Sequence, residues 1–280
     1  MAIDWVCEVS SNHNGNLTRA LRFIEAAHQI GATTVKFQLF KITQLFAAEA
    51  LAARPELLAR QAWELPVAWL PTLAARAHEL HLRFSCTPFY MAAVEELAPY
   101  VDSYKVASYQ VLWLDLLRKI AAQGKPVALA LGMATVAETD AAVDALRACP
   151  QLTLLHCVSR YPTPLAECRL SQLAWLRARY PGCIIGWSDH STRPEALLSA
   201  TLRYGALAIE FHLDLDGSGV EYAGGHCWRP AAIQAVIQTV QQALTADGGG
   251  TEAEAEERLW RSDPHDGLRP RLSVRAGLHG

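Results

Sequence analysis

The sequence predicts an α/β fold, a (β/α)8 TIM barrel with a short C-terminal extension, on three observations. Eight short apolar or β-branched runs alternate with eight Ala/Leu-rich amphipathic segments. These eight units occupy about 245 residues, a length typical of this barrel. The rival fold, a doubly wound open sheet, usually has a Gly-rich first turn, and none follows the first predicted strand.

The elements follow in order along the chain. The predicted strands are Ile3–Ser10, Thr33–Leu39, Arg83–Thr87, Ser103–Ala107, Val127–Leu131, Leu152–Val158, Cys183–Ser188 and Leu207–His212. The predicted helices are 17–30, 66–80, 90–99, 112–123, 135–147, 169–180, 193–204 and 230–244. Asn16 and Thr135 stand where a helix needs a side-chain acceptor for its first N–H groups.

Two segments depart from this alternation. The connection 40–65 is too long for a plain loop, so we expect it to carry a short helix over the barrel mouth. Beyond the last predicted helix, we expect a charged helix in "TEAEAEERLW" and an irregular strap in "RSDPHDGLRPRL". We therefore predict a barrel domain over residues 1–245 and an extension over 246–280.

Composition excludes several classes of function. The 280 residues carry a formal net charge of −3, with no basic run longer than a dipeptide, which argues against a nucleic-acid partner. No apolar run approaches a membrane span, and "MAIDWVCEVSS" lacks the features of a signal peptide. The seven cysteines are scattered without a C-x-x-C, so we expect free thiols in a cytoplasmic protein.

Polar residues cluster at the ends of seven of the eight predicted strands, where TIM barrels place their active sites. They are Glu8, Ser10, Asn12, His13, Lys36, Gln38, Ser85, Thr87, Lys105, Ser108, His156, Ser159, Ser188, Asp189, His190, Glu210 and His212. Burying Lys and Glu inside a barrel is costly unless they are paired or bind a ligand. A site for a polar ligand explains this pattern better than a solvated rim does.

The stretch "WSDH" contains the three residue types of a hydrolase triad. Successive side chains on a strand point to opposite faces, so Asp189 cannot orient His190 while Ser188 and His190 share a pocket. The chain also lacks a G-x-S-x-G elbow. Serine hydrolase chemistry is therefore not expected.

A divalent metal is a better interpretation of the histidines. His190 and His212 end neighbouring strands on the inward face, where two imidazoles can share an ion. The alternative is a pair of hydrogen-bonded rim histidines. Asp189 and Glu210 are candidates for orienting them, and His226 in "AGGHCWRP" is a weaker third candidate ligand.

Lys36 and Lys105 form the natural anion site, able to hold a carboxylate or a phosphate. Side-chain donors stand on the same or neighbouring strands: Gln38, Thr87 and Ser108. The alternative is that each lysine pairs with Glu8 or Glu210. Both arrangements can hold if the ion pairs open when a ligand enters.

The motifs together resemble the N-acetylneuraminate (sialic acid) synthase family. "CEVSSNHNGNLTRALRFIEAAHQIGATTVKFQ" is similar to the family's opening, where E-x-x-x-N-H-x-G leads into a K-x-Q strand. "FSCTPF", "SYKVAS", "GKPVALALGMAT", "LLHCVSRYPTP", "GWSDHS" and "AIEFH" follow in the family's order. The resemblance covers about residues 4–215.

The resemblance implies a transferase that condenses phosphoenolpyruvate with a sugar aldehyde of the N-acylhexosamine type, giving a 2-keto-3-deoxy sugar acid and phosphate. By position, His190 and His212 match the family's metal ligands, with Mn²⁺ expected and Mg²⁺ or Co²⁺ as alternatives. Glu8 matches a carboxylate that handles protons or water, so the predicted catalytic set is Glu8, Lys105, His190 and His212. The predicted substrate-binding set is Asn12, Lys36, Gln38, Thr87, Ser108, Gln110, Ser159, Tyr161 and Ser188.

Three departures from the family pattern stand out. Gln110 occupies the place of a Glu in the family's S-G-E, and Gln cannot act as a general base. Ala130-Leu131-Gly132-Met133 replaces S-T-G-M, and a lost hydroxyl contact to a charged group costs about 1.5–3 kcal/mol. We recognise no antifreeze-like C-terminal domain, which in the family supplies a sugar-binding Arg across a dimer. Arg261 or Arg269 could substitute, and a homodimer is a possible assembly.

These departures keep two other functions open. One is a metal-dependent aldolase or lyase acting on a pyruvate-type substrate. The other is a non-catalytic barrel that binds sugar acids or phosphate.

Overall fold

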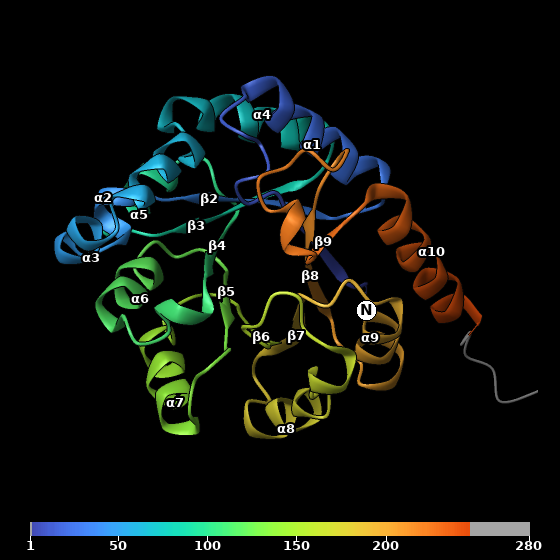
Figure 1. Cartoon of the computed structure of the whole chain (residues 1–280). Coiled ribbons are helices and arrows are strands. Elements are labelled where there is room, and N and C mark those ends of the chain that lie inside the picture. Colours follow the sequence, from blue (N-terminus) through green and yellow to red (C-terminus); the bar gives the residue numbers. More distant parts are fainter. Residues whose placement is uncertain (1, 247–280) are drawn as a thin grey trace, which may run out of the picture. The chain divides into compact units, whose positions relative to one another are not determined.

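A closed barrel of eight parallel strands forms the centre of the computed structural model, which describes residues 2–246 (Figure 1). The strands are β1 Asp4–Glu8, β2 Thr34–Leu39, β3 Arg83–Pro88, β4 Ser103–Val106, β5 Val127–Ala130, β6 Leu152–Cys157, β7 Ile184–Asp189 and β8 Ala208–Leu213. They pair in chain order, and β1 pairs with β8 from Asp4↔Ala208 to Glu8↔His212, which closes the barrel. The predicted fold is confirmed.

Helices follow the strands and surround the barrel (Figure 1). They are α1 Leu17–Gln29, α4 Leu70–Glu79, α5 Ala93–Leu97, α6 Leu114–Ala121, α7 Val136–Ala145, α8 Gln172–Arg179, α9 Pro194–Leu198 and α10 Pro230–Ala246, and a π-helix, Ser199–Arg203, continues α9. Both predicted caps are present. Asn16 accepts a hydrogen bond from the Arg19 N–H at 2.9 Å, and Thr135 forms a reciprocal capping box with Glu138.

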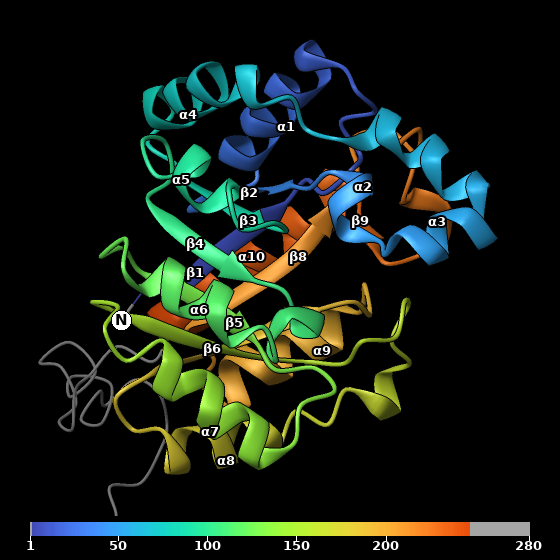
Figure 2. The same ribbon diagram turned by 90° about the vertical axis from the view of Figure 1, so that its left-hand side faces the viewer.

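The long connection after β2 contains more helix than expected. It holds α2 Ile42–Leu45, α3 Ala48–Ala53 and the 3₁₀ helix Pro55–Trp63. A separate apolar cluster around Phe40, Ile42 and Phe89 anchors it to the residues that follow β2 and β3. Figure 2 shows α2 and α3 at the end of the barrel toward which the strand arrows point.

Strand alternation separates two apolar regions. Large side chains such as Phe84, Trp187 and Phe211 face the helices and are fully buried in the main core. Inside the barrel, Ala130, Leu155, Cys157 and Ala208 form a small cluster of their own. The inward positions that come next along the strands, toward their carboxyl ends, are polar. The barrel interior thus changes from an apolar layer to a charged one along its axis.

A ninth strand was not predicted. β9, Cys227–Trp228, pairs in parallel with β8 through His212↔Cys227 and Leu213↔Trp228. Two residues produce no periodic signal, so the sequence pattern could not reveal them. This strand brings the segment 214–228 back to the barrel end and places residue 226 beside His212.

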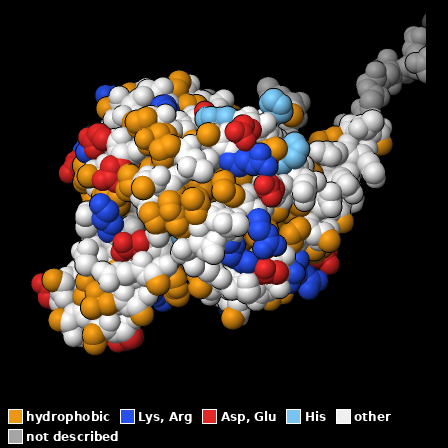
Figure 3. Space-filling model, turned by 90° about the horizontal axis from the view of Figure 1, so that it is seen from above, with side chains coloured by type: hydrophobic (Ala, Val, Ile, Leu, Met, Phe, Trp, Pro, Cys, Tyr) orange, Lys and Arg blue, Asp and Glu red, His pale blue; other side chains and the backbone are white. Residues whose placement is uncertain are grey.

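The predicted domain boundary at residue 245 lies at the end of α10, and it stays a prediction. The predicted tail helix and strap, with Arg261 and Arg269, lie outside the described residues. Among residues 2–246, no helix combines the length and the apolarity that crossing a membrane requires. On the face in Figure 3, basic and acidic side chains are interspersed, as the small net charge predicts.

Candidate active site

Two lysines and two glutamates form ion pairs inside the barrel. Lys36 contacts Glu8 and lies 3.6 Å from Glu210, and Lys105 lies 3.1 Å from Glu210. All four side chains are at least 95% buried. The alternative expected for the lysines, pairing with Glu8 and Glu210, is therefore what the structure shows.

The pairing favours the charged forms of Lys36 and Glu210. Burial alone would lower the pKa of Lys36, but the Glu210 and Glu8 carboxylates outweigh it and raise that pKa above its usual value. Burial would raise the pKa of Glu210, yet Lys105 and Lys36 hold it well below its usual range. Ser188 Oγ donates to Glu210 at 3.0 Å, and Gln38 Nε2 donates to Glu8 at 3.0 Å. Polar neighbours thus orient both carboxylates.

A cavity of about 90 Å³ opens above these pairs at the carboxyl ends of the strands. Nine of the predicted site residues line it: Lys36, Gln38, Thr87, Lys105, Ser108, Tyr161, Ser188, His190 and His212. Phe89 and Tyr109 stack at 5.6 Å between ring centres and, like Tyr161, line the same cavity. Glu8 is fully buried and is not among the lining residues. The cavity therefore combines a charged floor with aromatic walls.

Three predicted substrate-binding residues do not line this cavity. Asn12 donates to the Leu213 carbonyl and accepts from the Glu221 N–H, each at 2.9 Å. Gln110 donates to the Pro88 carbonyl at 2.8 Å and accepts from the Ala107 N–H at 2.9 Å. Ser159 Oγ lies 3.1 Å from Ser108 Oγ, which does line the cavity. Direct substrate contact by Asn12, Gln110 and Ser159 stays a prediction.

Gln110 has a structural role that a glutamate could not fill in the same way. Its amide uses one donor and one acceptor to join the ends of β3 and β4. A carboxylate has acceptors alone, so it would leave the buried Pro88 carbonyl without this donor. This bond pattern is a physical reason for Gln at a position where the resembling family has Glu.

Asp189 faces away from the cavity and holds the fold. It accepts hydrogen bonds from the Ser191 hydroxyl at 2.6 Å and from the Trp228 indole at 2.8 Å. It is fully buried, whereas its neighbours Ser188 and His190 line the cavity. The prediction against a triad agrees with this geometry. The suggestion that Asp189 orients the histidines does not agree with it, because Asp189 accepts its hydrogen bonds from Ser191 and Trp228.

His190 is held as a neutral ring. Its Nδ1 lies 2.8 Å from the Val158 carbonyl, and because a carbonyl can only accept, Nδ1 carries the proton. Burial, with a contribution from His212, lowers the pKa of His190 to about 3. Its ring stands 4.1 Å from the Tyr161 ring and 5.6 Å from the His212 ring, centre to centre. The lone pair on Nε2 is therefore available to a metal or a substrate.

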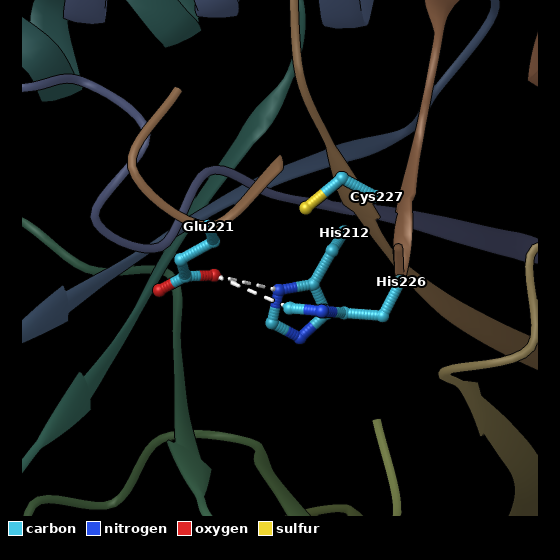
Figure 4. A group of neighbouring side chains, drawn as sticks. All are labelled: His212, Glu221, His226 and Cys227. Carbon is cyan, nitrogen blue, oxygen red and sulfur yellow. Dashed lines mark ion pairs between the residues drawn. The ribbon is translucent and has the colours of Figure 1, made fainter. Parts of the chain in front are cut away.

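A second group of potential ligands surrounds His212. Its Nδ1 lies 3.3 Å from Glu221 Oε2, and His226 Nε2 lies 3.6 Å from the same oxygen. With Cys227, the ligand atoms of these residues all lie within 4.8 Å of one another. Figure 4 shows the Glu221 carboxylate facing both rings. His226 is the weaker third candidate ligand that the sequence predicts. Glu221 and Cys227 were not predicted as ligands, although all three residues follow the eighth strand closely in the sequence.

The charges in this group are coupled. Burial would raise the pKa of Glu221, but the neighbouring His212 and His226 imidazoles hold it well below its usual range. Burial would lower the pKa of His226, but Cys227 and Glu221 raise it to about 9. An anionic carboxylate beside two imidazoles is a donor set that suits a divalent transition metal.

The atoms of this group also fit a metal. His212 Nδ1, Glu221 Oε2 and His226 Nδ1 are buried without a hydrogen-bond partner. Buried polar atoms are normally hydrogen-bonded, so such a concentration calls for an explanation. A cation bound by His212 Nδ1 and Glu221 Oε2 would satisfy these two atoms, whereas His226 faces the carboxylate through its other nitrogen, Nε2.

A larger cavity, of about 520 Å³, has residues of α7 and α8 among its lining. His156, Arg169, Trp175 and Met133 also line it. His156 Nε2 lies 3.0 Å from the Cys168 carbonyl, so this histidine is tied to the fold. Within residues 2–246, no carboxylate lines this cavity, whereas the paired charges and converging histidines lie at the smaller one. We place the candidate active site at the smaller cavity.

Buried charge pairs and clustered histidines at the carboxyl ends of the strands place this protein in the class of (β/α)8 barrels with a polar site at that end of the barrel. The model of the NeuB family matches residues 23–252, and the chain belongs to that family. The most similar relatives include the spore coat polysaccharide biosynthesis protein SpsE of Bacillus subtilis, 31% identical over 75% of this chain. They also include the N,N'-diacetyllegionaminic acid synthase of Campylobacter jejuni, 30% identical over 88% of this chain.

The chain spans 59% of the length of the Bacillus relative and 77% of the Campylobacter relative. Among solved structures, the N-acetylneuraminic acid synthetase of Leptospira borgpetersenii, crystallised with citrate, aligns with a TM-score of 0.83 at 26% identity. That alignment covers 99% of this chain and 93% of that one. The Bacillus subtilis SpsE structure aligns with a TM-score of 0.78 at 27% identity, covering 91% and 72% of the two chains.

Proposed function

We propose that this protein is a metal-dependent synthase that condenses phosphoenolpyruvate with a sugar aldehyde of the N-acylhexosamine type. The products would be a 2-keto-3-deoxy sugar acid and phosphate. The observation that carries the proposal is the pair of buried lysines facing a cavity whose other side holds clustered histidines. Membership of a family with synthases among its named relatives supports it.

The lysines supply counter-charge to the first substrate. Phosphoenolpyruvate carries a carboxylate and a phosphate, and Lys36 on β2 and Lys105 on β4 both line the cavity. Each now pairs with a glutamate, so the anion would compete with Glu8 and Glu210 for them. Hydroxyl and amide donors line the same cavity: Gln38, Thr87, Ser108 and Ser188. These groups can orient the anion while the lysines neutralise it.

Glu8 is placed to handle a proton. It is fully buried, accepts from Gln38 through one oxygen and contacts Lys36 through the other. When a substrate anion takes over Lys36, Glu8 loses part of its counter-charge and becomes a stronger base. We assign to Glu8 the proton exchange with the water that adds to the enol-derived carbon.

The metal belongs at the histidines. A bound divalent ion, Mn²⁺ by our prediction, would act as a Lewis acid toward the aldehyde oxygen. His190 and His212 line the cavity from β7 and β8, so they face the space in which the aldehyde must meet the enol. The Tyr161 ring lies against the His190 ring, with 4.1 Å between the ring centres, and lines the same cavity.

The missing serine of strand five has candidate replacements. Ala130 lines the cavity where the resembling family has that serine. A side-chain carbon added at Gly132 would lie 2.4 Å from Ser159 Oγ, so the Ser159 hydroxyl stands directly beside the end of β5. Ser108 and Ser159 together offer two hydroxyl groups within reach of that position. We propose that they take over the phosphate contact.

The cellular setting is part of the proposal. All seven cysteines are free, which suits a reducing compartment such as the cytoplasm. The partners we expect are the two small-molecule substrates, and a homodimer stays a prediction.

The test is phosphate release from phosphoenolpyruvate over a panel of aldehydes, with and without Mn²⁺. We expect release that requires both the aldehyde and the metal, and a loss of at least about 100-fold in kcat/KM for Lys105→Met, because a buried counter-charge disappears. The surface variant Lys119→Met serves as the matched control and should leave the rate unchanged.

Other outcomes point to the other functions. Metal-dependent turnover of pyruvate without phosphoenolpyruvate would replace the synthase with an aldolase or lyase. Binding of phosphoenolpyruvate without turnover of any aldehyde would indicate a non-catalytic barrel.

A further inference from the structure

We propose that the aldehyde substrate is apolar at the end remote from its carbonyl, and that a side pocket next to the active-site cavity binds this end. The side pocket has a volume of about 160 Å³ and is lined by Gln44, Leu45, Phe89, Tyr109, Gln110 and Trp113. A deoxygenated or acylated carbon suits it better than a free primary alcohol. This assignment rests on the proposed function for the aldehyde and adds the substituent that the aldehyde carries.

The side pocket adjoins the active-site cavity. Phe89 and Tyr109 line both of them. The two rings are stacked, with 5.6 Å between their centres and 13° between their planes. Phe89 is buried in the apolar cluster that anchors the connection after β2, whereas Tyr109 is 57% exposed. A ligand longer than the cavity can therefore extend into the side pocket along the Tyr109 ring.

The side pocket lies across the barrel mouth from the histidines. Gln44 and Leu45 belong to α2, and Phe89 and Tyr109 follow β3 and β4. Since the eight strands pair in chain order and the barrel is closed, β3 and β4 lie opposite β7 and β8. The two histidines of the cavity stand at the ends of β7 and β8. An aldehyde whose oxygen faces them can therefore direct its other end toward the side pocket.

The lining of the side pocket selects against polar groups. Within residues 2–246, no Lys, Arg, Asp or Glu lines it, so a charged substituent would find no counter-charge there. Gln110 is part of the lining, but its amide already donates to the Pro88 carbonyl and accepts from the Ala107 N–H. A hydroxyl group would lose water and gain few partners, which costs free energy. An apolar group would instead gain contact with aromatic rings.

Apolar side chains are also exposed beside the side pocket. Tyr109, Leu112 and Trp113, which follow β4 closely, are 57%, 62% and 37% exposed. Exposed apolar side chains that gather in one place are typical of a binding surface. The apolar end of a substrate would cover part of this surface. The rival interpretation is a contact surface for another protein, in which case the side pocket would not distinguish one small molecule from another.

Binding of three open-chain alditols to the Mn²⁺-loaded full chain, without phosphoenolpyruvate, is the experiment. The probes are N-acetylmannosaminitol, its 6-deoxy derivative and its 6-O-acetyl derivative, which differ only at the end remote from the former aldehyde. Isothermal titration calorimetry gives the three dissociation constants. We expect the two derivatives to bind at least about fivefold tighter than the parent probe, because neither has to desolvate a hydroxyl group at that end.

Variants locate this preference in the side pocket. Tyr109→Ala and Trp113→Ala each remove an aromatic wall, so the affinities of the three probes should come within about twofold of one another. Tyr109→Phe keeps the ring and should keep the preference. Trp175→Ala is the matched control, because Trp175 on α8 is 40% exposed and lines neither space. Melting curves show whether each variant is folded.

Two results would overturn the assignment. One is equal affinity for the three probes, or no detectable binding, in the folded wild-type chain. The other is a preference that persists in folded Tyr109→Ala and Trp113→Ala. A failure of the proposed function gives a different result, because phosphoenolpyruvate is absent from this titration. A preference for the two derivatives without phosphate release in the activity assay refutes the synthase and leaves the side pocket standing.

Discussion

Ser188, Asp189 and His190 are neighbours in the chain and have three different surroundings. Ser188 donates to Glu210, Asp189 anchors Trp228 and Ser191 behind the barrel wall, and His190 faces the cavity. Strand alternation alone separates the first and third from the second. The face of the strand on which each residue lies therefore has to be established before a short polar motif is interpreted as a catalytic site.

A prediction at the scale of single residues concerns His13. Its ring is buried against Trp69, and its Nδ1 accepts the Gly15 N–H at 3.1 Å. Burial lowers the pKa of His13 to about 4, although the nearby Glu221 opposes this. The unfolded chain protonates His13 near pH 6.5, so its stabilising contribution is complete above that pH and is lost as the pH falls toward 4.

We expect acidification from pH 6.5 to pH 4 to reduce the free energy of unfolding by up to about 1.4 kcal/mol per pH unit through this residue. In His13→Gln this part of the pH dependence should disappear, and in the exposed control His28→Gln it should remain. Urea unfolding at several pH values measures both. An unchanged slope in His13→Gln would show that the fold does not lower the pKa of His13.

At the scale of elements, the eight barrel strands differ from β9 in how the sequence specifies them. The eight long strands carry apolar patterns of their own, and each predicted strand has a counterpart in the structure. β9 exists because Cys227 and Trp228 pair with His212 and Leu213 at the carboxyl end of β8, which is a tertiary contact. The segment that supplies Glu221 and His226 depends on that pairing.

Barrel closure predicts a sharp effect at Gly186 on β7. A Cβ atom there would lie 2.4 Å from the Ala208 carbonyl oxygen and 2.7 Å from a Leu155 methyl carbon. Gly186→Ala should therefore lower the free energy of unfolding by about 3 kcal/mol, because β7 and β8 must separate. Chemical denaturation measures this.

Gly182 provides the matched control, since nothing lies within 4 Å of a Cβ atom added there. Gly182→Ala should change stability by less than about 0.5 kcal/mol. Equal stability of the two variants would contradict the close packing of β7 against β8.

At the scale of the whole molecule, charge explains how an anion can be bound at all. The formal net charge is −3, so the chain as a whole does not attract anions. Inside the barrel, two lysines pair with two glutamates, and their charges cancel. Additional positive charge must come from elsewhere, and a divalent metal at the neighbouring histidines would supply it.

We therefore expect metal and phosphoenolpyruvate to bind cooperatively. Mn²⁺ should tighten phosphoenolpyruvate binding at least about fivefold, and by linkage phosphoenolpyruvate should tighten Mn²⁺ binding by the same factor. Isothermal titration in both orders measures the two factors, with Glu56→Gln as a folded control. Equal affinities with and without the metal would mean that the lysines suffice.

Much of the site could be predicted because its residues lie on strands of known alternation. Lys36, Lys105, His190 and His212 all line the cavity, as expected. Asn12 and Gln110 do not, since their amides join backbone segments that are distant in sequence. Glu221 could not be predicted, because it lies on an irregular segment that has neither the strand period nor the helix period from which side-chain direction is inferred.

The sequence by itself determined the barrel, since eight apolar periods and two capping residues are local signals that need no partner to be read. It also determined which strand residues face inward, because alternation is a property of the extended chain. The tertiary structure alone decided that the lysines are neutralised by Glu8 and Glu210, and that Glu221 and His226 stand beside His212. Lys36 and Glu210 are 174 positions apart in the sequence, and closure of the barrel brings them together. Glu221 and His226 return to His212 through the pairing of β9 with β8.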